Sequence, residues 1–385
     1  MQLARRLAFL FAILATLVAP VAANPMLLVD IDNLQVLYEQ EAGQPWHPAS
    51  LTKLMTAFVT FEAIANGRVS LDTKVVLSRK AVSQAPSTTG LPADSALSLQ
   101  DALYILIVKS ANDVAWAIAE TVSGSEEKFV AEMNGAARRL GMTATHFENP
   151  NGLHDPKQVT TARDLAVLSL YIRQLYPQYL PIFQTERVTL GKASMETNNN
   201  LLSHFAGTTG MKTGYICASG LNIVATAERG GRRLMAVVLG GSSARERGEM
   251  TAQLFLRGFS GAVKAEGRRV LDLANAVDAA PVDMRPKLCG KEAKAYVKAR
   301  EAEFPMGLDG QPSYLTDVVE GRTYAATNLG RLRDVPLPRI RPAHAPVASA
   351  VAVAATEPMP VSASVAPVAT LTAKGAPVPR PRLVR

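Results

Sequence analysis

Three short groups of residues in this 385-residue chain carry side chains suited to acyl transfer. They are Ser50-Leu51-Thr52-Lys53, Ser110-Ala111-Asn112 and Lys212-Thr213-Gly214. Lys53 follows Ser50 by three residues, and on a helix two such side chains share a face. A serine hydroxyl needs a base to take its proton, and a lysine can be that base when burial or a nearby cation lowers its pKa. The spacing therefore predicts Ser50 as the nucleophile and Lys53 as its base.

The other two groups could hold a peptide against this serine. The Asn112 amide can bind a peptide backbone, and the Ser110 hydroxyl can pass a proton toward a leaving nitrogen. Lys212 and Thr213 can bind a carboxylate, while Gly214 leaves room for a peptide along the edge of a strand. Each group alone is weak evidence, because S-x-x-K occurs by chance about once in a chain of this size.

Helices are predicted around the first two groups. Apolar residues recur at spacings of three and four from Leu51, and this pattern ends at Gly67. Ser98 with Asp101, and Thr161 with Asp164, have the spacing of capping boxes at helix starts. Further helices are predicted over 113–122, 126–140, 162–175 and 244–259.

Strands are predicted near both ends of this helical region. Residues 27–30 and 36–38 are apolar runs around the turn residues Asp32 and Asn33. The later runs cover 211–216, 221–227 and 234–239, and the last two are joined by Gly230 and Gly231. The pattern predicts an α+β fold with one antiparallel sheet, assembled from both ends of the domain and covered by helices.

The chain is predicted to have four parts. Residues 1–23 place Arg5 and Arg6 before an apolar run and small residues, as in a signal peptide cleaved after Ala23. Residues 24–262 form the catalytic domain, and residues 263–335 remain unassigned apart from a helix near 292–303. Residues 336–385 hold ten of the 24 prolines and are predicted to be disordered.

The formal net charge of +8 is concentrated at the two ends. Residues 1–23 contribute +2 and residues 336–385 contribute +5, which leaves +1 for the rest. The nearly neutral body argues against nucleic acid as a partner. The basic tail is expected to make weak, salt-sensitive contact with an anionic wall or membrane surface.

The three motifs together resemble the signature of penicillin-binding proteins and class A β-lactamases, with S-A-N in place of S-D-N. Longer strings resemble the low-molecular-mass D-alanyl-D-alanine carboxypeptidases over about residues 26–260. These strings are PASLTKLMT, KSANDVAWAIAE, FENPNGLHD, TTARDLAVLS and MKTGYICASGLNIVATA. The resemblance implies a β-lactamase/transpeptidase-like fold and a serine peptidase that needs no cofactor or metal.

The resemblance also implies roles for single residues. Ser50 would be acylated by the penultimate D-Ala of a peptidoglycan stem peptide, with Lys53 as base and Ser110 and Asn112 as the second wall. Lys212 and Thr213 would hold the terminal carboxylate. The backbone N–H groups of Ser50 and Tyr215 would form the oxyanion hole. β-Lactams would act as inhibitors, and the enzyme would work in the periplasm or cell envelope.

The residues of the three motifs are also compatible with other functions. The same residues suit a D,D-endopeptidase on cross-linked peptides, a β-lactamase, or a non-catalytic wall-binding protein. A β-lactamase is disfavoured because no E-x-x-L-N pattern lies between Ser110 and Lys212. His47 lies three residues before Ser50 and suggests a Ser-His-Asp triad, but Lys53 already supplies a base.

Three further residue groups lie outside the three motifs. The five histidines show no zinc-binding spacing. The segment Asn149-Pro150-Asn151-Gly152 is typical of a turn, and the residues leave open whether this turn is purely structural or has a catalytic role. Cys217 and Cys289 are the only cysteines, so in an exported chain we expect them to form a disulfide.

Overall fold

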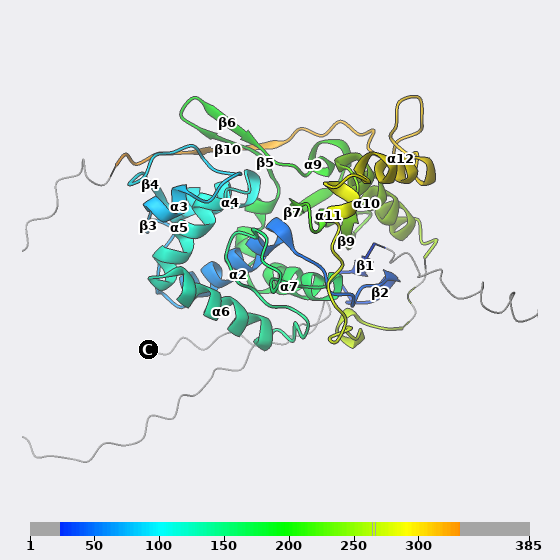
Figure 1. The fold of residues 1–385 in the computed structure, drawn as a ribbon, viewed down its shortest axis with the longest axis horizontal. Helices are drawn as coiled ribbons and strands as arrows, with labels where there is room; N and C mark the ends of the chain where they lie inside the picture. Colours follow the sequence, from blue (N-terminus) through cyan, green and yellow to red (C-terminus); the bar gives the residue numbers. More distant parts are fainter. Residues whose placement is uncertain (1–23, 264, 266, 332–385) are drawn as a thin grey trace, which may run out of the picture.

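The computed structural model describes residues 24–263, 265 and 267–331. The predicted signal peptide and the predicted tail therefore lie outside the described residues. The described residues fold into an α+β structure around one main sheet (Figure 1).

The main sheet has the strand order β2-β1-β9-β8-β7, and every neighbouring pair is antiparallel. Its strands are β1 (Met26–Asp30), β2 (Val36–Gln40), β7 (Thr208–Ile216), β8 (Gly220–Arg229) and β9 (Arg232–Gly241). The prediction of one antiparallel sheet from both ends of the domain is thus confirmed. Strand β7 lies at an edge of the sheet and pairs only with β8.

Both faces of the sheet are buried, because successive side chains on a strand point to opposite faces. Leu27 and Val29 face a large core with the helices that precede β7, whereas Met26 and Leu28 face a second core with α10 (Ala244–Phe259). The sheet is therefore a central layer covered by helices on both sides.

The helices of the first core begin and end within two residues of the bounds that the sequence patterns predicted. They are α2 (Thr52–Ala65), α4 (Leu99–Val108), α5 (Asn112–Ser123), α6 (Glu126–Arg139) and α7 (Ala162–Leu175). Ser98 caps α4 by accepting a hydrogen bond from the Asp101 N–H, and Thr161 caps α7 in the same way with Asp164. Figure 1 shows α4, α5 and α6 gathered on the side of α2 away from β1 and β2.

Several short elements were not predicted from the sequence. A two-stranded sheet pairs β3 (Lys74–Val76) with β4 (Ala96–Ser98). Other short elements before β7 are α3 (Arg79–Val82), η2 (Pro177–Tyr179), α8 (Leu180–Phe183), β5 (Thr185–Leu190), β6 (Ala193–Glu196) and α9 (Leu201–His204). They have three to six residues each, too few for a clear periodic pattern.

Residues 267–331 pack against the rest of the protein as a C-terminal wrap. Its elements are η3 (Val270–Asp272), α11 (Arg285–Leu288), α12 (Ala293–Glu303) and β10 (Arg322–Ala326). Val270 and Met284 are buried in the first core, and β10 pairs with β5 in parallel. The helix predicted near 292–303 is α12, which lies beside α10 in Figure 1. No described helix is both long and apolar enough to cross a bilayer.

Candidate active site

Ser50 lies in η1 (Ala49–Leu51), a short 3-10 turn that leads directly into α2. The preceding Ala49 has φ +49°, a backbone conformation that is unusual for a residue with a side chain. The chain before Ser50 is held to the sheet by Asn222 of β8. The Asn222 side-chain amide donates to the carbonyls of His47 at 3.1 Å and Pro48 at 3.4 Å. These contacts fix the position of the serine at the edge of the sheet.

Lys53 is fully buried in the first turn of α2 and points at the serine. Its Nζ lies 2.9 Å from Ser50 Oγ, 2.8 Å from Asn112 Oδ1 and 2.5 Å from the Asn151 carbonyl oxygen. Three oxygen atoms on three separate segments therefore fix the amine. The structure brings Ser50, Lys53 and Asn112 together as the sequence predicted.

The surroundings of Lys53 favour its neutral form. Burial lowers its pKa well below the usual lysine value, and the positive charge of Lys212 lowers it further. The negative charge of Asp113 raises the pKa, but by less. A neutral amine beside a serine hydroxyl is able to accept the serine proton.

Ser110 and Asn112 stand at the start of α5, where the backbone turns sharply. Ser110 has φ +61° and is buried, and its Oγ has no hydrogen-bond partner among the described residues. The next helix residue, Asp113, is buried and accepts hydrogen bonds from the Thr89 N–H at 2.8 Å and the Thr89 hydroxyl at 2.6 Å. Asp113 thereby anchors the start of α5, close to Ser110.

Strand β7 supplies the opposite wall with Lys212, Thr213, Gly214 and Tyr215. Gly214 packs against η1 so closely that a Cβ would lie 2.9 Å from Ser50 N and 3.1 Å from Leu51 N. A side chain here would push β7 away from the serine, which explains the glycine. Tyr215 is 52% exposed, whereas Lys212 and Thr213 are buried.

Lys212 shares this region with a second buried basic residue, Arg247, which no sequence motif indicated. Burial lowers the pKa of Lys212 to about 7, and the charge of Arg247 on α10 contributes. Arg247 is itself buried and donates to the Asn198 carbonyl at 2.7 Å. No short motif marks Arg247, because its position depends on the packing of α10 onto the sheet. Two basic side chains, Lys212 of β7 and Arg247 of α10, are thus close enough to interact where an anion is expected to bind.

The turn at Asn149–Gly152 lies at the site, which is one of the two possibilities that the sequence left open. The Asn151 carbonyl accepts a hydrogen bond from Lys53, and Gly152, with φ +88°, lies against the chain at Ala49. A Cβ at Gly152 would stand 1.9 Å from the Ala49 carbonyl oxygen. The only available signal was the glycine at the end of an Asn-rich turn.

His47 does not serve as the partner of Ser50. Its Nδ1 lies 3.0 Å from the Gln158 carbonyl oxygen, and its ring packs edge-on against His154 with centroids 5.0 Å apart. The hydrogen-bond partner of the Ser50 hydroxyl is Lys53. The arrangement is therefore a Ser-Lys pair rather than a Ser-His-Asp triad.

Cys217 and Cys289 are joined in a disulfide, as expected from the sequence. Cys217 follows β7 directly, and Cys289 follows α11 of the C-terminal wrap. The bond thus links the wrap to the strand that carries Lys212 and Thr213.

Comparison with known proteins places this geometry in a class. The solved structure of penicillin-binding protein 6B from Escherichia coli matches with a TM-score of 0.58 and 35% identity, over 62% of this chain and 78% of that one. Penicillin-binding protein D2 from Listeria monocytogenes, in a cefotaxime-bound form, matches with a TM-score of 0.56 and 34% identity, over 62% and 97%. The fold is thus the α+β fold of the β-lactamase/transpeptidase type.

Sequence comparison gives the family within this class. The model of the D-alanyl-D-alanine carboxypeptidase family, Peptidase S11, matches residues 14–243. The chain belongs to this family. The D-alanyl-D-alanine carboxypeptidase DacC of Escherichia coli K12 is 35% identical over 257 residues, which cover 65% of this chain and 64% of that protein. The chain spans a little under two thirds of the length of the first curated relatives it matches.

Proposed function

We propose that this protein is a serine D-alanyl-D-alanine carboxypeptidase, which removes the terminal D-Ala from peptidoglycan stem peptides through an acyl-enzyme on Ser50. The observation that carries the proposal is the buried Lys53 amine 2.9 Å from Ser50 Oγ. A non-catalytic wall-binding protein has no need of a buried amine beside an uncharged serine, since burying an ionisable group is unfavourable.

The contacts of Lys53 suit a general base in its neutral form. A neutral amine has two N–H bonds and one lone pair. The two N–H groups can donate to Asn112 Oδ1 and the Asn151 carbonyl, and the lone pair can then accept the Ser50 hydroxyl hydrogen. As Ser50 Oγ attacks the carbonyl carbon of the penultimate D-Ala, its proton passes to Lys53 Nζ.

The developing oxyanion needs fixed donors, and the backbone N–H groups of Ser50 and Tyr215 are proposed to supply them. Support comes from the close packing of Gly214 on η1, which brings the two segments together. Removing one such donor typically lowers kcat by about 10² to 10³.

The substrate carboxylate is proposed to bind Lys212 and Thr213. The charges of Lys212 and Arg247 favour an anion here, and a bound carboxylate would keep Lys212 protonated. Asn112 would hold the peptide backbone from the opposite wall. The unpartnered Ser110 hydroxyl would carry a proton to the nitrogen of the leaving D-alanine. Water then hydrolyses the ester on Ser50.

A D,D-endopeptidase activity on cross-linked peptides would use the same residues and differs in the leaving amine, which belongs to a second stem peptide instead of a terminal D-alanine. The exposed Tyr215 and the edge position of β7 leave the strand accessible to an extended peptide. The carboxypeptidase remains the first proposal, because the two buried cations suit a free terminal carboxylate.

The proposed location is the periplasm or cell envelope, reached with the signal peptide of residues 1–23. The basic tail of residues 336–385 is proposed to make weak contact with an anionic wall or membrane surface. Such contact would be lost at high salt, because the Debye length falls to about 3 Å at 1 M.

The proposal is tested by measuring D-alanine release from an acylated L-Lys-D-Ala-D-Ala tripeptide, with the Ser50→Ala variant as the control. Release by the wild type and none by the variant is expected. A parallel reaction with a cross-linked peptide dimer measures the endopeptidase activity. Cleavage of the dimer without D-alanine release would replace the carboxypeptidase with the endopeptidase, and no cleavage of either substrate would contradict both.

A further inference from the structure

The end of strand β7 pairs with β8 and also contacts the C-terminal wrap. Because β7 lies at the sheet edge, only β8 pairs with it, and its other edge is open to a peptide. The proposed oxyanion hole has one donor on β7 and one on η1. Its width therefore depends on how firmly the end of β7 is held against the serine.

Three contacts hold the turn that follows β7. Cys217 is bonded to Cys289, and the Ala218 carbonyl accepts a hydrogen bond from the Met284 N–H at 3.0 Å. Leu288 packs on Gly220, where an added Cβ would lie 3.0 Å from its Cδ1. The first contact is covalent, and all three come from α11 or from the residues directly before and after it.

The wrap is itself well anchored around α11. Met284 is buried in the first core, and Asp283 accepts hydrogen bonds from the backbone and side chain of Arg285 at the start of α11. Further along, Arg300 of α12 forms an ion pair with the buried Glu246 of α10. The disulfide thus connects the end of β7 to a support that other contacts keep in place.

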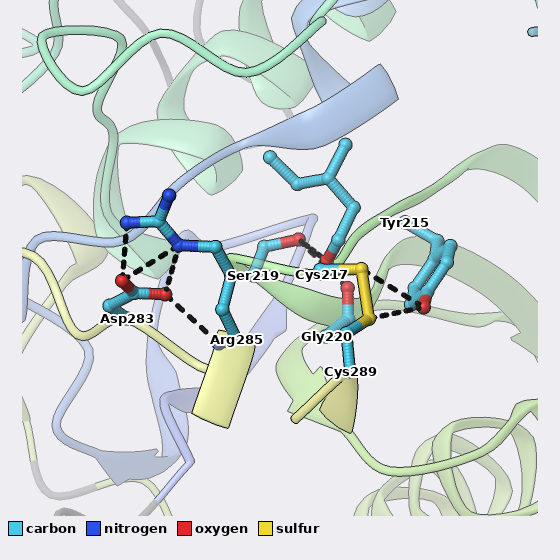
Figure 2. Close-up of a disulfide and its surroundings, with 8 residues drawn as sticks. Tyr215, Cys217, Ser219, Gly220, Asp283, Arg285 and Cys289 are labelled. Atoms are coloured by element: carbon cyan, nitrogen blue, oxygen red, sulfur yellow. Dashed lines mark hydrogen bonds and ion pairs between the residues drawn. A yellow bond between two sulfur atoms is a disulfide. The ribbon is translucent and has the colours of Figure 1, made fainter. Parts of the chain in front are cut away.

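Tyr215 lies directly beside this bond. Figure 2 shows its hydroxyl facing both sulfur atoms, at 3.4 Å from Cys289 Sγ and 3.8 Å from Cys217 Sγ. Tyr215 is the last but one residue of β7, and Cys217 is the first residue after this strand. The disulfide therefore supports the residue whose backbone N–H is the proposed oxyanion donor.

The bond is also within reach of a reductant. Cys289 is exposed and Cys217 is partly exposed. A thiolate of a dithiol can attack an accessible sulfur and form a mixed disulfide, which the second thiol of the dithiol resolves. The dithiol gives up two electrons and becomes a disulfide, while Cys217 and Cys289 become two thiols.

We propose that the Cys217–Cys289 disulfide, with α11, positions the Tyr215 backbone N–H for acylation of Ser50, so that a dithiol reductant lowers the acylation rate without unfolding the protein. This inference rests on the proposed function. The bond acts through Tyr215 and does not touch the reacting atoms, so Cys217 and Cys289 are positioning residues.

The test compares the oxidised full-length protein, the same protein reduced with dithiothreitol, and the Cys217→Ser/Cys289→Ser double variant. Stopped-flow mixing with a fluorescent penicillin gives the acylation rate constant separately from the affinity of the first complex. Each form is measured below its own melting temperature, followed by circular dichroism. A displacement of about 1 Å lowers a rate by about 10². We therefore expect the acylation rate constant to fall about tenfold or more in both forms that lack the disulfide, with little change in affinity.

Two single variants separate positioning from general stability. Leu288→Ala keeps the disulfide but removes the contact with Gly220, and it should lower the acylation rate in the same direction by a smaller factor. Val318→Ala, a wrap residue that is 98% exposed, should leave the rate unchanged. If the double variant does not fold, the test rests on Leu288→Ala alone. A wild-type acylation rate constant in this folded variant would then overturn the proposal.

The outcomes distinguish this inference from the proposed function. If the oxidised wild type is not acylated, both are overturned. If it is acylated and the folded reduced forms react at the same rate constant with only a lower melting temperature, the disulfide merely stabilises the fold and the positioning inference alone fails.

Discussion

Replacing Gly152 by alanine should disable the site by displacing its loop. Gly152 has φ +88°, and an added Cβ would lie 1.9 Å from the Ala49 carbonyl oxygen and 2.9 Å from Ser50 N. Both neighbours are backbone atoms next to the nucleophile. To reach an ordinary contact of 3.4 Å, the loop and the Ser50 segment must separate by about 1.5 Å. The hydrogen bond of 2.5 Å from Lys53 to the Asn151 carbonyl would then break.

The size of the effect follows from this displacement. A misplacement of about 1 Å costs about 10² in rate, so the acylation rate constant of Gly152→Ala should fall by about 10² or more. The assay is stopped-flow acylation by a fluorescent penicillin. Gly124→Ala is the matched control, because Gly124 has φ +80° and no atom within 4 Å of an added Cβ.

Both substitutions force an alanine into the left-handed region, at about 1 to 2 kcal/mol of unfolding free energy. Only Gly152→Ala should lose acylation. A folded Gly152→Ala variant that acylates as fast as Gly124→Ala would refute the view that this loop positions Lys53 and Ser50.

Three further results are expected. The pH profile of kcat/KM should be bell-shaped: its acid side falls as Lys53 becomes protonated, and its alkaline side falls above about pH 7 as Lys212 loses the charge that binds the carboxylate. A flat profile from pH 6 to 9 in wild-type kinetics would contradict these roles. Penicillin should stay bound for minutes, because water attack without a placed base loses a factor of about 10² to 10⁴, and release at many turnovers per second would indicate a β-lactamase. Deleting residues 336–385 should leave turnover of a soluble peptide unchanged while weakening low-salt sedimentation with anionic vesicles or isolated wall, and a loss of turnover would show that the tail acts in catalysis.

The sequence predicted the local parts of the structure well, because local rules determine them. The helices over 162–175 and 244–259 have the predicted bounds, since their first residues follow a serine or threonine cap and their apolar residues keep helical spacing. Ser50, Lys53 and Asn112 were identified for a related reason. Their motif spacing fixes two of them on one helical turn, and the third stands at the start of a helix.

The parts that could not be predicted depend on long-range packing. Arg247 reaches the site because α10 covers the sheet, and nothing near it in the sequence marks that position. The Asn151 contribution is a backbone carbonyl, which no residue type reveals. The C-terminal wrap follows the surface of the domain, and its strand β10 pairs with β5 more than 130 residues earlier in the chain.

The central claim is that Ser50 is acylated with Lys53 as its base, and one measurement tests it most directly. Intact protein is incubated with benzylpenicillin, and its mass is measured before and after proteolytic mapping, with Ser50→Ala and Lys53→Met alongside the wild type. We expect one penicilloyl group per chain on the peptide that contains Ser50, none in Ser50→Ala, and strongly slowed formation in Lys53→Met. An adduct on another residue, or an unchanged rate in a folded Lys53→Met variant, would contradict it.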